Sequence, residues 1–267
     1  MNQPAIPVAV TGASGKMAQE ALAAIMRDPE VDLVGASSRR LTGADLPVAG
    51  GGSTPLFRDL GALLEKVKAR VLVDFTVAEA AMDHVRIAFR HGVSPVVGTT
   101  GLSAENLKEM QELSQSTGLG AVVAPNFALG AVLMMYMSRV AARYFDYAEI
   151  IELHHERKAD APSGTALSTA QGMARARGRA FNWKAAQKET LSGTRGGQLE
   201  GIGIHSIRIP GLVAHQEVIL GTTGQTLTIR HDTFSRESFM PGLLLAIKEV
   251  VRQDHVVVGL DKLLGLE

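Results

Sequence analysis

The chain has 267 residues, of which 46% are hydrophobic and 20% charged, as expected for a globular protein of one large or two modest domains. Lys plus Arg and Asp plus Glu balance at 27 each, which argues against nucleic acid or an anionic membrane as the main partner. The absence of cysteine excludes disulfides, thiol catalysis and thiolate–metal sites.

The sequence gives no sign of membrane insertion or export. It contains no run of 18 apolar residues, so no membrane span is expected. The segment Met1–Pro4 lacks the charged and apolar regions of a signal peptide, so we expect a cytoplasmic protein. We expect no metal site.

The first motif is a strand, a glycine turn and a helix. A β-rich run at 6–10 leads into the turn, and a helical pattern follows over 17–26. Gly12 permits a tight turn, Gly15 lets the backbone approach a pyrophosphate at the helix N-terminus, and Ala18 replaces a third glycine. The spacing G-x-x-G-x-x-A departs from the G-x-G-x-x-G fingerprint, so a plain turn between strand and helix stays an alternative.

A second strand is predicted at 31–36, and its end bears on the choice of cofactor. NAD enzymes usually place a carboxylate there to hold the ribose 2′-hydroxyl. This chain has Ser37-Ser38-Arg39-Arg40 instead, with two guanidinium groups that could bind a 2′-phosphate. The pattern favours NADP over NAD. The alternative is that both arginines are simply solvated.

The rest of the first half alternates helices with strands. Residues 41–55, rich in Gly, Pro and Ser, are predicted to form a surface loop. Further helices are predicted at 60–67, 79–91 and 103–116, and further strands at 71–76, 94–97 and 121–124. This order predicts an α/β fold with a doubly wound parallel sheet, whose ligand lies beyond the carboxyl ends of the strands.

The second half has a different character. A long helix is predicted at 128–144, with methionines interpreted as core filling, and a mobile loop at 184–201. Strands at 202–209, 216–220 and 225–231 are joined by short turns, which predicts a mixed or antiparallel sheet. A last helix, from Ser235 or Ser238 to Val251, is expected to return to the first domain. We therefore predict a dinucleotide-binding domain at 1–127, completed by about 236–267, and a second domain at 128–235.

The segment 150–166 carries the clearest candidate site. A strand ends in His154-His155, Lys158 follows, and a helix begins near Ser163 or Asp160. Cations beside a helix N-terminus favour an anionic ligand. The alternative is one core and one surface histidine beside a solvated lysine.

Several motifs together resemble one family, the 4-hydroxy-tetrahydrodipicolinate (dihydrodipicolinate) reductases of lysine and diaminopimelate biosynthesis. The resemblance spans nearly the whole chain. It rests on GASGKM at 12–17, DFT at 74–76, GTTG at 98–101, APNF at 124–127, ELHH at 152–155, KADAPSGT at 158–165, IHSIR at 204–208 and AHQEV at 214–218.

The resemblance implies a role for individual residues. The pyrophosphate would be held by Gly12, Ala13, Ser14, Gly15, Lys16 and Met17. Ser38 falls where an NAD-binding Glu occurs in some relatives, and Arg39 where a 2′-phosphate is held. The nicotinamide side would be lined by Gly98, Thr99, Thr100, Ala124, Pro125, Asn126 and Phe127. His154 would be the proton donor or acceptor and Lys158 the proton donor, while His155, Gly164 and Thr165 would bind the substrate's carboxylates.

The implied reaction fits the residues. The substrate would be a small cyclic imine dicarboxylate that loses water, and hydride from NADPH, or from NADH, would add to ring C4. A cationic group must meet the negative charge that develops toward the ring nitrogen, and a positioned acid must supply a proton. The resemblance also implies a homotetramer built through the sheets of the second domain. Some relatives carry Arg-His where this chain has Glu156-Arg157, so no role is assigned to those two positions.

Two other functions stay open from the sequence. One is another NADP-linked reductase of amino-acid metabolism, similar to homoserine dehydrogenase; an aspartate-semialdehyde dehydrogenase is excluded because it needs a catalytic cysteine. The other is a non-catalytic NADP sensor, which would have no need of clustered His and Lys at a helix start.

Overall fold

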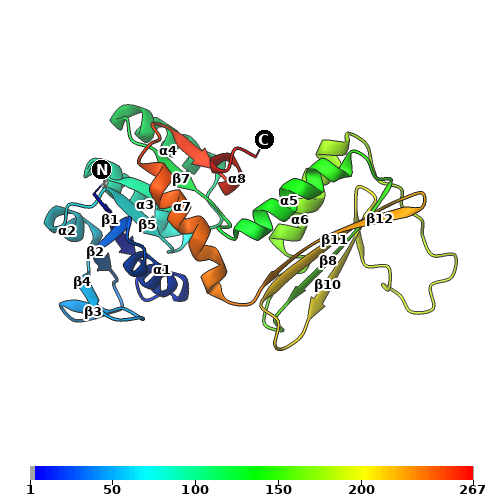
Figure 1. Cartoon of the computed structure of the whole chain (residues 1–267), viewed down its shortest axis with the longest axis horizontal. Coiled ribbons are helices and arrows are strands. Elements are labelled where there is room, and N and C mark those ends of the chain that lie inside the picture. Colours follow the sequence, from blue (N-terminus) through cyan, green and yellow to red (C-terminus); the bar gives the residue numbers. More distant parts are fainter. Residues whose placement is uncertain (1–3, 267) are drawn as a thin grey trace. The chain divides into compact units, whose positions relative to one another are not determined.

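The structure, a computed structural model, describes residues 4–266 (Figure 1). The sequence-based expectation about a signal peptide falls largely on residues 1–3, outside this range. The chain divides into two compact units. The first unit contains the residues up to Leu129 and those from Arg236 onward, and the second contains 130–235. None of the described helices has the length and apolar character that crossing a bilayer requires.

The first unit is built on an eight-stranded sheet with the order β13-β7-β6-β5-β1-β2-β4-β3. All neighbouring strands are parallel except β3 and β4, which are antiparallel. The strands are β1 (Ile6–Thr11), β2 (Val31–Ser37), β3 (Asp45–Pro47), β4 (Ser53–Phe57), β5 (Val71–Asp74), β6 (Ser94–Val97), β7 (Ala121–Val123) and β13 (Val256–Val258). The strand order reverses at β1, between β2 and β5, where ligands of such sheets bind.

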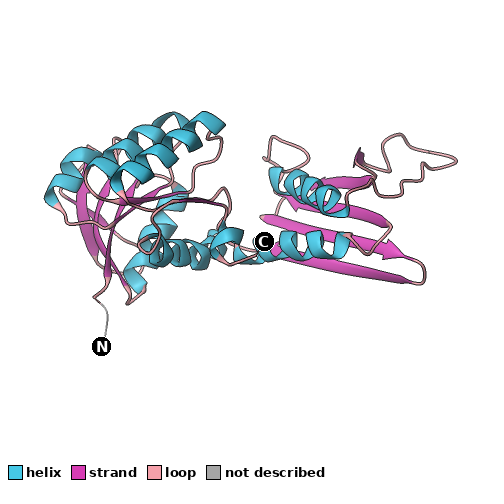
Figure 2. Ribbon diagram, turned by 90° about the horizontal axis from the view of Figure 1, so that it is seen from above, coloured by secondary structure: helices cyan, strands magenta, loops and turns pink. Residues whose placement is uncertain are grey.

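Helices cover both faces of this sheet, as Figure 2 shows. α1 packs on α7, while α3 packs on both α2 and α4. Their bounds are α1 (Lys16–Arg27), α2 (Leu60–Lys66), α3 (Ala78–Arg90), α4 (Ala104–Thr117), α7 (Met240–Val250) and the short α8 (Leu260–Leu263), with a 3-10 turn at Arg236–Phe239 before α7. The predicted α/β class with a doubly wound parallel sheet is confirmed.

Two details of the first unit differ from the prediction. Residues 41–55 are not simply a loop, because β3 and most of β4 lie there and pair with each other. Each of these short strands buries little, with Leu46 and Thr54 directed inward, so the alternation was too brief to detect. Three consecutive valines form β13, which extends the sheet beside β7 and was also missed.

The second unit has a five-stranded sheet with the order β12-β11-β8-β10-β9. The central strand β8 is parallel to β10 and antiparallel to β11, so the sheet is mixed, within the prediction. Its elements are α5 (Leu129–Ala142), β8 (Tyr147–His154), α6 (Gly164–Arg177), β9 (Gly197–Leu199), β10 (Ile202–Arg208), β11 (Ala214–Thr222) and β12 (Gln225–Thr233). The predicted loop at 184–201 therefore ends in a strand, β9, because residues 197–199 pair with β10.

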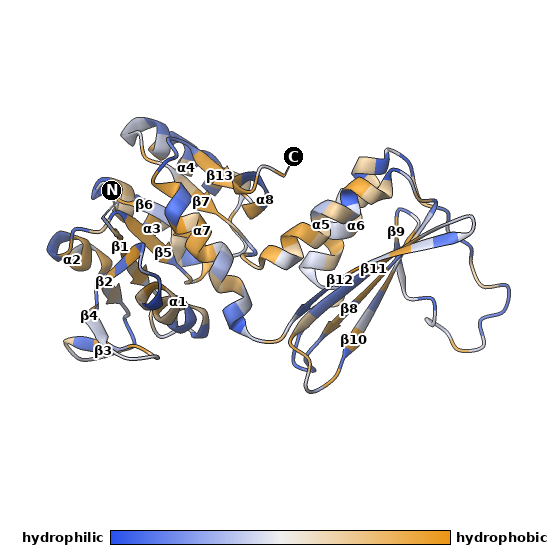
Figure 3. Cartoon of the chain, viewed as in Figure 1, coloured by the Kyte–Doolittle hydropathy of each residue, from blue (hydrophilic) through white to orange (hydrophobic). Residues whose placement is uncertain are grey.

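The two helices of this unit cover one face of its sheet. Ala142 of α5 and Met173 of α6 pack in one core with Ile150 of β8. The expectation that the methionines of α5 fill the core is only partly right: Met134 is buried, whereas Met137 is 46% exposed. Figure 3 shows how strongly apolar α5 is along its length.

The alternation along β8 places a carboxylate in the covered face. Ala148, Ile150 and Glu152 are buried under the helices, while Glu149 and Ile151 point to the other face and are less buried. Glu152 is fully buried at the end of this row. A buried charge needs partners, and those partners define the site described below.

Candidate functional site

The glycine turn after β1 forms an open helix start. Gly12 has a φ of +76°, and a Cβ there would press against the Thr76 side chain, so glycine is required at this position. Gly15 is the N-cap of α1, and its N–H donates to the Gly12 carbonyl oxygen at 2.8 Å. A glycine has no side chain with which to cap the helix. The first N–H groups of α1 therefore remain available to an anion.

The turn after β2 presents the two arginines. The Ser38 Oγ accepts hydrogen bonds from the N–H groups of Arg40 and Leu41, at 3.2 and 3.3 Å. Ser38 itself is buried, whereas Arg39 and Arg40 are exposed. This local turn holds both guanidinium-bearing residues at the carboxyl edge of the sheet, where folds of this kind bind dinucleotides.

A cavity of about 520 Å³ joins these two turns. It is lined by Gly12, Ser14, Gly15, Ser38 and Arg39 of the predicted cofactor set. It is also lined by Arg40 and by two residues with no role assigned from the sequence, Arg58 and His84. Arg58 follows β4 and approaches the Arg39 carbonyl oxygen at 3.5 Å, so three arginines surround one end of the cavity.

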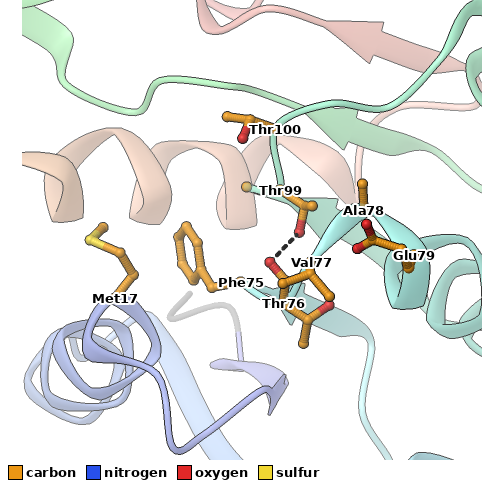
Figure 4. Close-up of a pocket in the computed structure, with 9 residues that line it drawn as sticks. Met17, Phe75, Thr76, Val77, Ala78, Glu79, Thr99 and Thr100 are labelled. Carbon is orange, nitrogen blue, oxygen red and sulfur yellow. Dashed lines mark hydrogen bonds between the residues drawn. The ribbon is translucent and has the colours of Figure 1, made fainter. Parts of the chain in front are cut away.

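A second cavity, of about 400 Å³, lies beside Phe75 and is drawn in Figure 4. Met17, Gly98, Thr99 and Thr100 of the predicted set line it. The Thr99 Oγ1 donates to the Thr76 carbonyl oxygen at 3.2 Å, which joins the ends of β5 and β6. A side chain at Gly98 would collide with the Phe75 ring, so this glycine keeps the aromatic wall in place.

The remaining predicted cofactor residues line neither cavity. Ala13 is buried, and Lys16 is exposed at the start of α1. Phe127 is buried and meets Phe75 edge to face, with 5.9 Å between ring centroids. The segment 124–126 follows β7 at the same edge of the sheet, and the Asn126 side chain accepts the N–H of Ala128 at 2.9 Å.

A buried hydrogen-bonded group supports the turn after β5. Asp74 is fully buried, and its Oδ2 lies 2.8 Å from Nδ1 of His84 on α3. Its Oδ1 accepts from the N–H and the hydroxyl of Thr76, at 2.7 and 2.6 Å. These bonds fix Thr76, which lines both cavities.

In the second unit, His154 forms a compact group with Glu152 and Arg208. The Nδ1 atom of His154 lies 2.5 Å from the Oε2 atom of Glu152. The Arg208 guanidinium donates to both carboxylate oxygens, at 2.8 and 2.7 Å. Arg208 is on β10, whose parallel pairing places it opposite His154.

Lys158 lies in the loop after β8 and is near His154. Its ammonium group donates to both carboxylate oxygens of Asp160, at 2.7 and 2.9 Å. Glu156 pairs with the neighbouring Arg157 at 3.6 Å, and the Arg157 side chain is 83% exposed. Neither residue is among the groups that shift the pKa of His154, whereas Lys158 is.

The start of α6 offers backbone donors beside these cations. Ser163 is the N-cap, as one of the two predicted alternatives, and its Oγ accepts the N–H of Ala166 at 3.1 Å. The N–H groups of Gly164 and Thr165 have no acceptor within residues 4–266. The space around Gly164 is open, and the buried Nδ1 of His155 also lacks a partner in the described chain.

The charges of this group shift its pKa values. Burial lowers the pKa of His154, the Glu152 carboxylate raises it, and Lys158 and Arg208 lower it, so that it lies below its usual 6.5. Burial would raise the pKa of Glu152, but hydrogen bonds from Arg208, Ser206 and His154 outweigh it, and the net shift is downward. Glu152 is therefore a carboxylate and His154 is mainly neutral at neutral pH.

Two family models together match nearly the whole chain. Residues 6–127 match the family model described as dihydrodipicolinate reductase, N-terminus, and residues 130–264 match the one described as dihydrodipicolinate reductase, C-terminus. The chain belongs to the dihydrodipicolinate reductase family. The family expected from the sequence motifs is confirmed.

Individual reductases of this family match the whole chain. The 4-hydroxy-tetrahydrodipicolinate reductase of Dehalococcoides mccartyi is 51% identical over 262 residues, which cover 98% of this chain and 99% of the relative. That of Bacillus subtilis is 45% identical over 269 residues, covering 99% and 100%. The solved structure "Dipicolinate bound Dihydrodipicolinate reductase from Paenisporosarcina sp. TG-14" superposes with a TM-score of 0.88 and 40% identity, covering 97% of this chain and 99% of that one.

Sequence reasoning about this reductase missed three side chains that its structure brings to the sites. Arg58 and His84 line the cavity of about 520 Å³ in the first unit, and in the second unit Arg208 donates hydrogen bonds to Glu152. His84 had a detectable signal, because a polar strand end at Asp74 is followed by a helix that carries a histidine. Arg58 and Arg208 had none, because their positions depend on strand pairing.

Proposed function

We propose that this reductase converts 4-hydroxy-tetrahydrodipicolinate to tetrahydrodipicolinate, with loss of water and hydride transfer from NADPH to ring C4. Membership of the dihydrodipicolinate reductase family makes the chain a pyridine-nucleotide-dependent oxidoreductase of the lysine and diaminopimelate pathway. The observation that carries the residue-level proposal is the group formed by His154, Lys158 and the open start of α6. It combines a neutral imidazole, an ammonium group and unpaired backbone N–H groups.

The cofactor is assigned to the first unit. The residues present fit a dinucleotide, because α1 begins at Gly15 without a side-chain cap and a cavity continues past it along the sheet edge. Such a cofactor supplies the hydride. We assign the pyrophosphate to the segment 12–17 and the nicotinamide to the side of Phe75, Gly98, Thr99, Thr100 and 124–127.

NADPH is proposed as the preferred form. The 2′-phosphate carries about two negative charges near neutral pH. Arg39 and Arg40 follow β2, and Arg58 lies beside them in the lining of the same cavity. Guanidinium groups bind phosphate bidentately, and the absence of a carboxylate at 37–40 removes the usual partner of a free 2′-hydroxyl.

The substrate is assigned to the second unit. Its two carboxylates would be bound by the N–H groups of Gly164 and Thr165, and by His155, whose buried Nδ1 has no partner within residues 4–266. Lys158 would donate a proton and meet the negative charge that develops toward the ring nitrogen. Asp160 forms an ion pair with the Lys158 ammonium group, so substrate binding must compete with that ion pair.

We also infer a homotetramer and a cytoplasmic location. The face of the second sheet that α5 and α6 leave uncovered carries Ile151, Leu153, Ile207 and Ile219. Such a row of branched apolar side chains suits burial against a second copy. Light scattering of the purified chain measures its mass, and a monomer would contradict the proposed assembly.

The decisive experiment follows NADPH and NADH absorbance with the condensation product of pyruvate and aspartate semialdehyde as substrate. Lys158→Met keeps the length of the side chain and removes the charge, so we expect kcat to fall by about 100-fold or more, the usual contribution of a positioned acid. NADPH affinity should be unchanged, since Lys158 belongs to the second unit.

Two results would contradict the proposal. Wild-type turnover in Lys158→Met would remove Lys158 from the mechanism. NADPH binding without any substrate-dependent oxidation by the wild-type chain would favour a nucleotide sensor, and oxidation with aspartate semialdehyde alone would favour a reductase similar to homoserine dehydrogenase.

A further inference from the structure

We propose that Glu152 is the positioning residue of His154: its carboxylate holds the Nδ1–H group, which leaves Nε2 as a proton acceptor toward the substrate. Arg208 in turn holds Glu152 in place. This inference rests on the proposed function, because it assigns the direction of proton transfer at the same site. His154 would accept the ring proton that is lost in the dehydration and pass it to the departing hydroxyl, which leaves as water. Lys158 would donate the proton that the ring takes up with the hydride.

Hydrogen bonds from three elements hold the Glu152 side chain in one position. The side chain has no exposed surface. Its Oε1 accepts from Arg208 Nη2 at 2.7 Å and from the backbone N–H of Ser163 at 3.1 Å. Its Oε2 accepts from Arg208 Nη1 at 2.8 Å and lies 2.5 Å from His154 Nδ1. The carboxylate is therefore bound from β8, β10 and the start of α6, and it has little freedom to rotate.

These partners fix the tautomer of His154. Arg208 and the Ser163 N–H can only donate hydrogen bonds, so Glu152 serves them as an ionised acceptor. The hydrogen between Glu152 and His154 must then belong to the imidazole, on Nδ1. A neutral imidazole carries a single N–H, so Nε2 has a lone pair. The same arrangement, a carboxylate behind a histidine, orients the base of hydrolytic triads.

The charges around His154 favour its role as a proton acceptor. The groups that face it are Glu152 on its own strand, Arg208 on β10 and Lys158 in the following loop. The two cations and burial oppose protonation in the resting state, so Nε2 is free to accept. Once it has accepted a proton, the imidazolium is stabilised by Glu152 at 2.5 Å.

Arg208 links this group to Lys158. Besides Glu152, its Nη2 donates to the Asp160 carbonyl oxygen at 2.8 Å. The Asp160 side chain pairs with Lys158. One guanidinium thus holds both the carboxylate behind His154 and the turn that carries the proposed proton donor.

The test compares Glu152→Gln with Glu149→Gln. Both glutamates lie on β8, and each has one histidine and one arginine partner. Glu149 belongs to the opposite face, with His205 and Arg195 at 2.8 and 2.7 Å, and has no role in the proposed mechanism. Glutamine keeps the size of the side chain, removes its charge and replaces one acceptor oxygen by an NH2 donor in both variants.

We expect Glu152→Gln to lower kcat by about 10- to 100-fold, the usual effect of removing the carboxylate behind a functional histidine or ligand. Its KM for NADPH should stay unchanged. The acid limb of kcat/KM should move to lower pH, because His154 loses the carboxylate that raises its pKa. Glu149→Gln should keep the wild-type kcat and pH profile. Wild-type kcat and an unmoved limb in folded Glu152→Gln would overturn the proposal.

Glu152→Gln leaves a buried guanidinium without its counter-charge and could therefore unfold. The double variant Glu152→Gln, Arg208→Gln removes both charges together. It should show the lowered kcat and an acid limb moved in the same direction but by less, because Arg208 itself lowers the pKa of His154.

A spectroscopic measurement needs no active variant. In wild-type protein labelled with ¹⁵N-histidine, the signals of His154 are identified by their loss in His154→Gln. The proposal requires the proton on Nδ1 at neutral pH, and a proton on Nε2 alone would refute it. This readout separates the inference from the proposed function, because the tautomer is measured without any substrate.

Discussion

Arg39→Ala tests whether the exposed arginine after β2 discriminates between the two cofactors. Arg39 borders the cavity that also contains the open start of α1. NADPH and NADH differ only at the ribose 2′ position, so a side chain that binds the 2′-phosphate should affect one cofactor and leave the other nearly untouched.

The magnitude follows from the kind of contact. A hydrogen bond to a charged group contributes about 1.5 to 3 kcal/mol, which corresponds to roughly 10- to 150-fold in an equilibrium constant. Arg39 is exposed to solvent, and Arg40 and Arg58 remain beside the phosphate. Both facts reduce the contribution of Arg39, so we expect a loss near the lower end of that range, about 10- to 30-fold in kcat/KM for NADPH.

The assay measures kcat/KM for NADPH and NADH with wild type, Arg39→Ala and the double variant Arg39→Ala, Arg58→Ala. NADH should change by less than about twofold, since no 2′-phosphate is present. The double variant should lose more of the NADPH activity than the single variant, and raising the ionic strength should reduce the difference from wild type. An equal loss for both cofactors would refute the assignment of Arg39 to the 2′-phosphate.

Two further outcomes follow from the same sites. Gly98→Ala should destabilise the fold by about 1 to 3 kcal/mol, because the added methyl group overpacks against Phe75, and it should raise the KM for NADPH. Thermal melting and kinetics measure the two effects. Gly164→Ala serves as the stability control, because the space around Gly164 is open. The pKa of His154 is lowered, so the imidazole stays neutral down to below pH 6.5 and the acid limb of kcat/KM should fall below that value. An acid limb above pH 6.5 would contradict the environment described for His154.

Local patterns were sufficient to predict most elements of the fold. The glycine turn at 12–15 and the capping of α4 by Ser103 depend only on neighbouring residues, and the structure contains both, with Ser103 and Asn106 forming a reciprocal capping box. Short strands such as β3 and β13 were missed because three residues give no measurable alternation.

The candidate site was predictable only in part, for a topological reason. His154 and Lys158 lie in one continuous segment and could be recognised from it. Their partner Arg208 is separated from Glu152 by 56 positions in the sequence, and the two meet only because β10 pairs with β8 in parallel register. A sequence pattern carries no information about that register until the strand order is known.

The N-termini of the first-unit helices differ in how they are capped. α2 is capped by Asp59, whose side chain accepts the N–H of Ala62, and Asp59 also lines the cavity of about 520 Å³. α4 begins with a capping box, which satisfies the N–H groups of Ser103 and Asn106, and it lines neither cavity. α1 begins at Gly15 and α3 at Val77, residues whose side chains cannot cap a helix. Gly15 lines the cavity of about 520 Å³, and Val77 lines both cavities.

A helix start without a side-chain cap costs stability, about 1 kcal/mol for a residue such as Val77 and only a few tenths for a glycine such as Gly15. The cost is offset when an anion binds the same N–H groups. The open starts of α1 and α3, together with three arginines, would account for the proposed anion site in a chain whose formal net charge is zero. NADPH should accordingly raise the melting temperature of the first unit more than that of the second, where Glu152 already satisfies its buried partners internally.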